Sequence, residues 1–230
     1  MTYKLFYFLL LIGCWHNLIA QKNKISIGGS PEFSMSSIAG QKEATLSRQS
    51  SNPVFNPGFH FFIEHSVKKN ITIRSRFGYN KKGIILNQIP GIDPFGNGVL
   101  IQKITQSLRY ASIGVDCKAI LPTAKANYYV AIGPYVSRLV LAKAETTYPY
   151  NIDSSTNRQK EDIASYFNKL DWGLTSTIGV EIPLDKKIAL NAQLRYEYGL
   201  LNISARELFR NQTIRNRSII LGVGIRYLLP

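Results

Sequence analysis

The sequence is poor in cysteine and histidine, and after its first twenty residues it has no long apolar segment. Only two cysteines are present, and Cys14 lies near the N-terminus, so removal of that segment would leave Cys117 without an intramolecular disulfide partner. His60 and His65 are five residues apart, which places them on opposite faces of a strand and predicts no shared metal ion. No later segment reaches the roughly 18 apolar residues of a membrane-spanning helix. We therefore expect no metal, no cofactor and no transmembrane helix.

The N-terminal segment has the pattern of an export signal. Lys4 supplies the positive charge, residues 5–12 form the apolar core, and Ala20 is a small residue at a suitable cleavage point. An alternative stays open, because the Leu-Ile-Gly-Cys sequence that ends at Cys14 has the form of a lipobox, in which this cysteine would become the acylated first residue. The preferred interpretation is a cleaved signal peptide at residues 1–20, followed by one domain at residues 21–230.

Basic residues outnumber acidic ones twofold, with 28 Lys and Arg against 14 Asp and Glu, which gives a formal net charge of +14. Such an excess predicts anionic partners. For an exported chain these are lipid head groups or acidic solutes, because the sequence has no basic helix and no aromatic RNA-binding motif. We expect no nucleic-acid binding, and we expect outer-membrane lipid and lipopolysaccharide to be the partners of the basic segments.

Long stretches of the sequence alternate between apolar and polar residues with a period of two. In the clearest stretch, from Ser218 to Leu229, one face consists of Ile219, Leu221, Val223, Ile225, Tyr227 and Leu229. A period of two is typical of a β-strand whose two faces meet different environments. The usual strand of a soluble protein has about 5–6 residues, whereas a tilted strand that crosses a bilayer needs about 9–11. The length and the alternation together predict a transmembrane β-barrel.

Eight such strands can be placed along the chain. Their ranges are Ile25–Ser34, Gly58–Val67, Ile71–Asn80, Leu108–Leu121, Asn127–Leu141, Leu170–Ile182, Lys187–Leu200 and Arg217–Leu229. The connections alternate between short ones, at 68–70, 122–126 and 183–186, and long ones, at 35–57, 81–107, 142–169 and 202–216. The sequence therefore predicts an all-β fold: an eight-stranded antiparallel up-and-down transmembrane β-barrel with short periplasmic turns and long extracellular loops.

Two of the long connections lead to more detailed expectations. The residues Pro90, Gly91, Pro94, Gly96 and Gly98 are turn formers, so they predict a loop over 81–107. In the third long connection, residues 159–167 have the pattern of a short amphipathic helix.

The alternation also assigns the charged side chains to one face of each strand. A Lys or Arg on the lipid face costs about 2–4 kcal/mol at mid-depth, so the charged face must line the lumen. The residues expected in the lumen are Arg74, Arg76, Asp116, Lys118, Glu181, Arg195, Glu197 and Arg226. Because eight strands enclose an interior only just wide enough for side chains, we expect these charges to pair and fill the barrel. The alternatives are a narrow porin-like channel for small anionic solutes or ions, since basic groups predominate, and a soluble barrel of the lipocalin class.

Six segments follow one another in a characteristic order and spacing. They are Gly58–Glu64 (GFHFFIE), Arg76–Gly83 (RFGYNKKG), Tyr129–Val136 (YVAIGPYV), Leu170–Leu174 (LDWGL), Leu194–Ile203 (LRYEYGLLNI) and Leu221–Tyr227 (LGVGIRY). Together they resemble the PorT-like outer-membrane β-barrel family of Bacteroidetes. The resemblance implies an outer-membrane barrel, and the members that give the family its name assist a secretion pathway. One departure is the C-terminal Pro230, because outer-membrane barrels usually end in an aromatic residue.

No pattern in the sequence indicates catalysis. His60 shares a strand face with Glu64 and Ser66, but no nucleophile elbow accompanies it, so we expect no enzyme activity. The predicted function is structural: a monomeric barrel of the bacterial outer membrane that serves as an anchor or as an accessory to an envelope or secretion complex. The candidate contacts to lipopolysaccharide phosphates are three basic residues of the last long loop, Arg206, Arg210 and Arg215.

Overall fold

The computed structural model describes residues 24–39, 51–93, 95–149, 157–204 and 215–230. These residues form nine β-strands and one short 3-10 helix. The strands are β1 (Ile25–Ala39), β2 (Ser51–Lys68), β3 (Ile71–Ile92), β4 (Gly98–Pro122), β5 (Asn127–Thr147), β6 (Arg158–Asp162), β7 (Leu170–Pro183), β8 (Ile188–Gly199) and β9 (Arg215–Leu228), and the helix is η1 (Ala164–Tyr166). No helix in the described ranges is long and apolar enough to cross a membrane.

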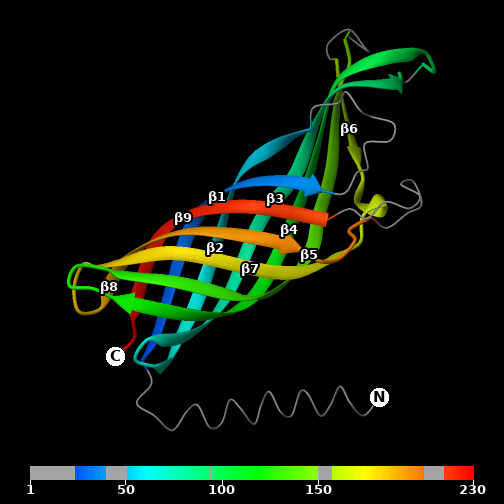
Figure 1. Ribbon diagram of the computed structural model, residues 1–230. Coiled ribbons are helices and arrows are strands. Elements are labelled where there is room, and N and C mark those ends of the chain that lie inside the picture. The colour runs from blue at the N-terminus through cyan, green and yellow to red at the C-terminus, as the bar shows by residue number, and fades with distance from the viewer. Residues whose placement is uncertain (1–23, 40–50, 94, 150–156, 205–214) are drawn as a thin grey trace, which may run out of the picture.

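Eight of the strands close into a ring in which all neighbours are antiparallel (Figure 1). Starting from β4, the order around the ring is β3, β2, β1, β9, β8, β7 and β5, and β5 pairs again with β4. The first and last strands close the ring, with pairs that run from Ser26 with Leu228 to Ala39 with Arg215. The short strand β6 lies outside the ring and pairs with β5. The predicted eight-stranded up-and-down barrel is confirmed.

The two ends of the barrel differ in their connections. At one end the strands are joined by the tight turns at residues 69–70, 123–126 and 184–187, and the start of β1 and the end of β9 lie at this end too. The third turn is held by Asp185, whose Oδ1 accepts hydrogen bonds from the backbone N–H groups of Lys187 at 2.6 Å and Ile188 at 2.7 Å. We call this the short-turn end, and we call the opposite end, to which the long connections belong, the outer end.

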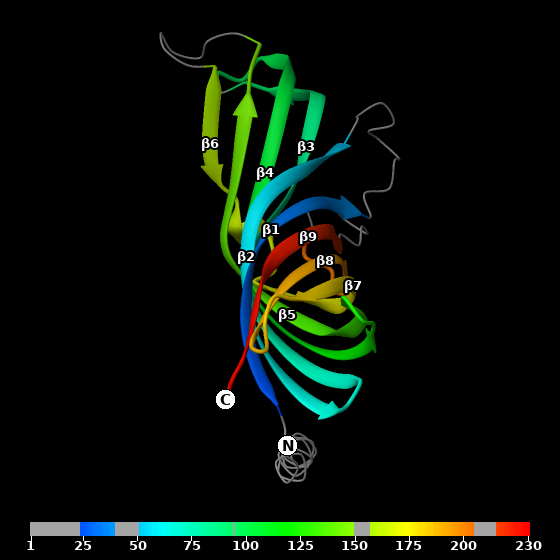
Figure 2. The same cartoon turned by 90° about the vertical axis from the view of Figure 1, so that its left-hand side faces the viewer.

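At the outer end β3, β4 and β5 continue beyond the ring, and together with β6 they form a projecting sheet (Figure 2). The expected loop over 81–107 was therefore wrong, because β3 and β4 stay paired as far as Ile92 with Gly98. Pro90 does not break this hairpin. The described part of β2 pairs with β3 only as far as Leu86, so Pro90 lies on a sheet edge, where its missing N–H costs no ladder hydrogen bond.

The expected amphipathic helix over residues 159–167 was also wrong. Residues 158–162 form β6, which pairs with β5 from Lys143 with Asp162 to Thr147 with Arg158. Only Ala164–Tyr166 are helical, and they form a single 3-10 turn. Residues 143–147 of β5, at the outer end, present backbone N–H and C=O groups on the side away from β4. Pairing with β6 satisfies these groups, whereas a separate helix would not.

The burial of side chains is the reverse of that in a soluble protein. Along β5 every second residue from Tyr129 to Leu139 is buried, and the residues between them are exposed. The exposed positions of the ring are apolar, as at Ile132 and Val136, whereas many buried positions are polar or charged. A soluble barrel of the lipocalin class would need an apolar lumen and a polar exterior. The observed faces are those of a barrel whose outer wall contacts lipid.

Candidate functional site

The middle of the lumen is organised around Asp116, which β4 directs inward and which is fully buried. Arg74 donates to Asp116 Oδ2 from Nε at 3.2 Å and from Nη2 at 3.1 Å. Arg76 donates from Nε to Oδ2 at 2.6 Å and from Nη2 to Oδ1 at 2.9 Å, and the Thr175 hydroxyl donates to Oδ1 at 3.0 Å. A Cβ at Gly114 would lie 2.9 Å from Arg76 Nη2, so the glycine leaves room for this guanidinium. One carboxylate thus holds two guanidinium groups.

A second group of charges joins β1 to β8 across the intervening strand β9. Arg195 donates from Nη1 to Glu32 Oε1 and from Nη2 to Glu32 Oε2, both at 2.8 Å. This bidentate arrangement is among the strongest ion pairs that side chains form. His60 Nδ1 lies 2.8 Å from Glu32 Oε1, and Arg195 Nε donates to Glu197 Oε1 at 3.2 Å. Glu32 therefore contacts both Arg195 of β8 and His60 of β2.

Towards the short-turn end, Lys118 is the centre of a third group. Its Nζ donates to Glu64 Oε1 at 2.7 Å and to Glu181 Oε1. The same ammonium group lies 4.3 Å from the centre of the Tyr129 ring, within the range of a cation–π interaction. Arg226 Nε lies 3.3 Å from Glu181 Oε2, and its side chain is partly exposed at this end of the barrel.

Towards the outer end, Lys82 of β3 is the centre of a fourth group, as Lys118 is of the third. Its Nζ lies 3.1 Å from Glu197 Oε2 and 3.5 Å from Asp171 Oδ2. The rings of Tyr110 and Tyr135 lie 5.4 Å and 5.0 Å from the same nitrogen, measured to the ring centres. Because carboxylates and aromatic faces surround the ammonium group, the buried charge of Lys82 is compensated.

Apart from His60, which the formal charge counts as neutral, the described part of the lumen holds equal numbers of basic and acidic side chains. The basic ones are Arg74, Arg76, Lys82, Lys118, Arg195 and Arg226, and the acidic ones are Glu32, Glu64, Asp116, Asp171, Glu181 and Glu197. Each of these side chains has an oppositely charged partner within ion-pair distance. The charges of the two sets cancel, so the formal net charge of +14 rests on residues outside the lumen.

An apolar cluster lies next to the lumen charges at the outer end. Its members are Leu108, Tyr110, Leu139, Ala142, Ala144, Ile163, Phe167 and Ile203. Strands β4 and β5 supply the first five, and the segments around η1 and after β8 supply the others. Asn168 ties these two segments together, because its Nδ2 donates to Asn202 O at 2.8 Å and to Ser204 O at 3.1 Å. We call this group the outer cluster.

The structure places the residues that the sequence assigned to the lumen as follows. Arg74, Arg76, Asp116, Lys118, Glu181, Arg195 and Glu197 are buried inside the ring, and Arg226 lies at its short-turn end. Sequence reasoning did not include Glu32, Glu64, Lys82 and Asp171 in this set. Lys82 lies two residues beyond the expected end of its strand at Asn80, and it continues the inward face of that strand. The other three have the inward parity of their own strands, which was a usable signal.

Of the three arginines proposed for lipopolysaccharide contact, the described structure includes Arg215 alone. Arg206 and Arg210 lie outside the described residues. Arg215 is the first residue of β9, and its Nη1 donates to the hydroxyl of Tyr198 at 3.5 Å.

The surroundings of His60 are those of a structural residue. Besides Glu32, its polar neighbour is Gln193, whose Nε2 lies 3.5 Å from His60 Nε2, and its ring lies 5.6 Å from that of Phe62. In the described ranges no group of three or more His, Cys, Asp or Glu side chains is arranged to hold a metal ion.

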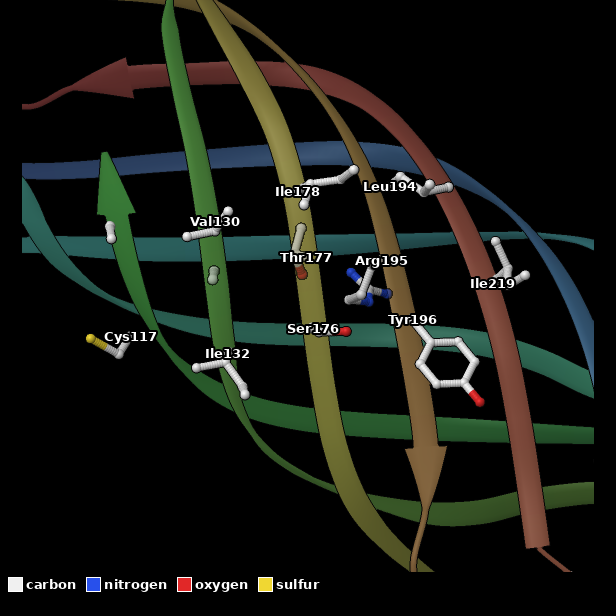
Figure 3. Close-up of a pocket in the computed structure, with 12 residues that line it drawn as sticks. Cys117, Val130, Ile132, Ser176, Thr177, Ile178, Leu194, Arg195, Tyr196 and Ile219 are labelled. Carbon is white, nitrogen blue, oxygen red and sulfur yellow. The ribbon is translucent and has the colours of Figure 1, made fainter. Parts of the chain in front are cut away.

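A groove of ≈ 690 Å³ lies on the outer wall of the barrel (Figure 3). Most of its lining consists of outward side chains of β4, β5, β7, β8 and β9, namely Cys117, Ala119, Val130, Ile132, Ser176, Ile178, Leu194, Tyr196 and Ile219. Short side chains such as Cys117, Ala119 and Ser176 leave a hollow among the larger ones. Because the groove is apolar and lies on the lipid-facing surface, it fits an acyl chain better than a polar solute.

A closed antiparallel ring with an apolar outer wall and a charged, paired interior defines a class of protein, the transmembrane β-barrel. The family model described as "Outer membrane protein beta-barrel domain" matches residues 19–205. The chain belongs to this family, and it is therefore a protein of the bacterial outer membrane.

Two solved structures are similar to this chain over most of its length. The outer membrane protein OprG from Pseudomonas aeruginosa is 9% identical, with a TM-score of 0.52 over 90% of this chain and 95% of that chain. A major outer membrane protein from Thermus thermophilus is 10% identical, with a TM-score of 0.49 over 91% of this chain and 100% of that chain. At 9% identity the likeness to OprG concerns the fold alone. No curated protein matches the sequence.

Proposed function

We propose that the protein is a closed outer-membrane barrel that anchors and displays its projecting sheet, and that it neither conducts solutes nor catalyses a reaction. The observation that supports this proposal is the state of the lumen charges. Arg74, Asp116 and Lys118 have no exposed surface, and Arg195 is 1% exposed. A conducting pore needs water along its axis, and water would contact such groups.

The charge balance also bears on the alternative of a narrow anion channel. That alternative rested on an excess of basic groups in the lumen. Glu32, Glu64 and Asp171 supply further negative charges, and the six basic and six acidic side chains cancel. A paired and neutral lumen does not attract an anion, since each cation is already bound to a carboxylate.

Planar-bilayer conductance tests the proposal. The purified protein is expected to give no conductance steps, whereas a hollowed variant with Arg76→Ser, Asp116→Ser and Arg74→Ser should give small ones. Folding of both proteins is checked beforehand by the shift in gel mobility between unheated and heated samples. Steps in the wild-type recordings, above all steps with anion preference, would contradict the closed lumen.

The projecting sheet suggests what such an anchor displays. Strands β3 and β4 extend well beyond the ring, and their hairpin ends in exposed apolar side chains at Ile92, Phe95 and Leu100. The resemblance to the PorT-like family and an accessory role in an envelope or secretion complex stay predictions. They are tested by a pull-down from solubilised outer membranes with the full chain and with a variant in which residues 88–102 are replaced by an Asn-Gly turn. A protein that co-purifies with the full chain alone would identify a partner of the sheet.

A further inference from the structure

Four cations lie on the outside of the barrel where the wall of β3, β4 and β5 passes into the projecting sheet. They are Lys81, Arg109, Arg138 and Lys143. Each lies between two buried neighbours that face inward, so its own side chain is on the outer face. Arg109, Arg138 and Lys143 are exposed, and Lys81 is half-buried. We call these residues the outer cation cluster.

The strand register brings the four residues next to one another. Arg109 pairs directly with Lys81 on one side. On the other side, Arg138 pairs with Ala111 and Lys143 pairs with Ser107, so both are diagonal neighbours of Arg109 on the same face. Directly opposite residues have Cβ atoms about 4.5–5.5 Å apart, and diagonal neighbours lie about 7–8 Å apart. Arg109 is therefore the centre of a compact positive patch.

The four cations of this patch differ from the lumen cations in their charged contacts within the described part of the chain. None of the four residues belongs to an ion pair of the described chain. Asp162 lies opposite Lys143 in the β5–β6 register and supplies a nearby carboxylate at the edge of the patch, although it forms no ion pair with Lys143; its Oδ1 accepts a hydrogen bond from the backbone N–H of Ala164. Like charges that lie opposite one another destabilise a sheet. A bound anion would remove this repulsion.

The position of the patch along the wall corresponds to the outer membrane interface. The outward residues of β4 below Arg109 are Ala111, Ile113, Val115, Cys117, Ala119 and Leu121. From Leu121 to Ala111 the chain advances ten residues. At about 3.3 Å per residue and a tilt of about 40°, this distance spans about 25 Å, which is the height of the apolar band of such barrels. Arg109 is the next outward residue, so it lies where lipid head groups begin.

We infer that the outer cation cluster is a binding site for the phosphate groups of a phosphorylated outer-leaflet lipid. Guanidinium and ammonium groups bind phosphate through charge-assisted hydrogen bonds, and Arg109 can do so in a bidentate manner. The acyl chains of the bound lipid lie against the apolar wall below, along Val136, Pro134 and Ile132 of β5. Ile132 is part of the outer-wall groove (Figure 3). The path therefore leads from the phosphate site towards this groove.

The neighbouring wall of β1 and β2 differs from the outer cation cluster. At the outer end of β1 and β2 the outward residues include Phe33, Met35 and Phe55, and no outward cation occurs there in the described residues. Phe33 is 68% exposed and Phe55 is 75% exposed. A further outward cation at the outer end, Arg217 of β9, lies 5.3 Å from the centre of the Tyr198 ring, within the range of a cation–π interaction. The outer cation cluster differs from it, because its four cations lie next to one another on β3, β4 and β5.

Native mass spectrometry of the detergent-solubilised full chain tests the inference. The probes are bisphosphorylated lipid A, the same lipid without its phosphates, and inorganic phosphate. The wild type is expected to bind bisphosphorylated lipid A, and the double variant Lys81→Gln with Arg109→Gln should bind it about tenfold more weakly or worse, because charge-assisted hydrogen bonds are lost. The lipid without phosphates should bind both proteins equally and weakly.

Lys103→Gln is the matched control, since Lys103 is exposed on the same outward face of β4, farther along the projecting sheet. It should leave the binding of lipid A unchanged. Two results would overturn the inference: equal binding by the double variant and the wild type, or an equal loss in the Lys103→Gln variant. If a large excess of inorganic phosphate displaced the lipid completely, the site would be one for free phosphate, and the lipid assignment would fail. Conductance does not enter this test, so its result is independent of whether the lumen is closed.

Discussion

The lumen and the outer cation cluster differ in whether their basic side chains have carboxylate partners. Inside the ring, Lys118 has two carboxylates and an aromatic ring around its ammonium group, and it is fully buried. Outside, Arg109 faces Lys81 and lacks a carboxylate partner within the described residues. A charge that is withdrawn from water requires a protein partner, whereas a charge at the membrane surface can take its partner from lipid. The difference separates charges that hold the barrel together from charges that are available for binding.

The largest effect is expected from breaking the centre of the lumen. Asp116→Ala leaves the guanidinium groups of Arg74 and Arg76 buried beside each other without a shared carboxylate, so it should lower the free energy of unfolding by about 3–5 kcal/mol. Urea unfolding in lipid vesicles, followed by tryptophan fluorescence, measures the change. Glu161→Ala on exposed β6 is the control and should change the free energy by less than about 0.5 kcal/mol. Equal effects of the two substitutions would show that the lumen charges are solvated.

A new charge on the outer wall tests the lipid-facing side of the comparison. Ile132→Arg places a guanidinium in the apolar band and should cost about 2–4 kcal/mol in the same unfolding measurement. The reason is that the next outward residues along β5, Val130 and Pro134, are apolar and offer the charge no partner. Leu100→Arg makes the same change on the projecting sheet, where the cost should be less than about 1 kcal/mol. If both variants were equally stable, the outer wall would not contact lipid at Ile132.

The outer cluster is expected to contribute less than the lumen charges. Phe167→Ala removes a buried ring that packs with Ile163 and Ile203, so the free energy of unfolding should fall by about 2–3 kcal/mol. Phe95→Ala removes an exposed ring from the hairpin tip and should have an effect below about 0.5 kcal/mol. No difference between these two substitutions would mean that the outer cluster is not packed in the membrane.

The smallest effect concerns a turn at the short-turn end. The backbone N–H groups of Lys187 and Ile188 donate to Asp185 and hold the pKa of this carboxyl below its ordinary value of 3.8. A lowered pKa means that the contribution to stability is complete above 3.8 and disappears as the pH falls through the value in the folded state. Asp185→Ala should therefore be slightly less stable than the wild type at neutral pH, and the difference should vanish in acid. A difference that persists at low pH would assign the effect to something other than this carboxylate.

The sequence contained most of the information about the ring and less about what lies beyond it. Alternation with a period of two fixes both the strand and its face, which is why Arg195 and Glu197 could be assigned to the lumen face from the sequence alone. The ends of the strands were harder to predict, because the alternation of apolar and polar residues weakens where both faces of a strand meet water. Pro90 is a turn former in isolation, and only the end of the β2 pairing at Leu86 makes it compatible with a strand. Likewise, β6 exists because β5 extends far enough to pair with it.

The candidate site shows the same limit. The inward parity of Lys82 follows from extending its strand by two residues, so a longer strand estimate would have found it. The neighbourhood of Arg109 could not be read from the sequence in this way. It depends on the register of Arg109 with Lys81 of β3 and on a shift in the β4–β5 register between Arg109 and Tyr110. Strand register is a property of the assembled sheet.

The most direct test of the closed lumen is the reactivity of a cysteine placed inside it. Cys117 is first replaced by serine, and Ser137→Cys or Ser218→Cys then introduces one thiol at a buried lumen position whose hydroxyl has no hydrogen-bond partner among the described residues. Ser165→Cys, at an exposed position of η1, is the accessible control. With a charged methanethiosulfonate reagent, a closed lumen predicts rapid labelling of the control and labelling of the two lumen thiols only after unfolding. Rapid labelling of the lumen thiols in the folded barrel would show a water-filled lumen and would contradict the proposed function.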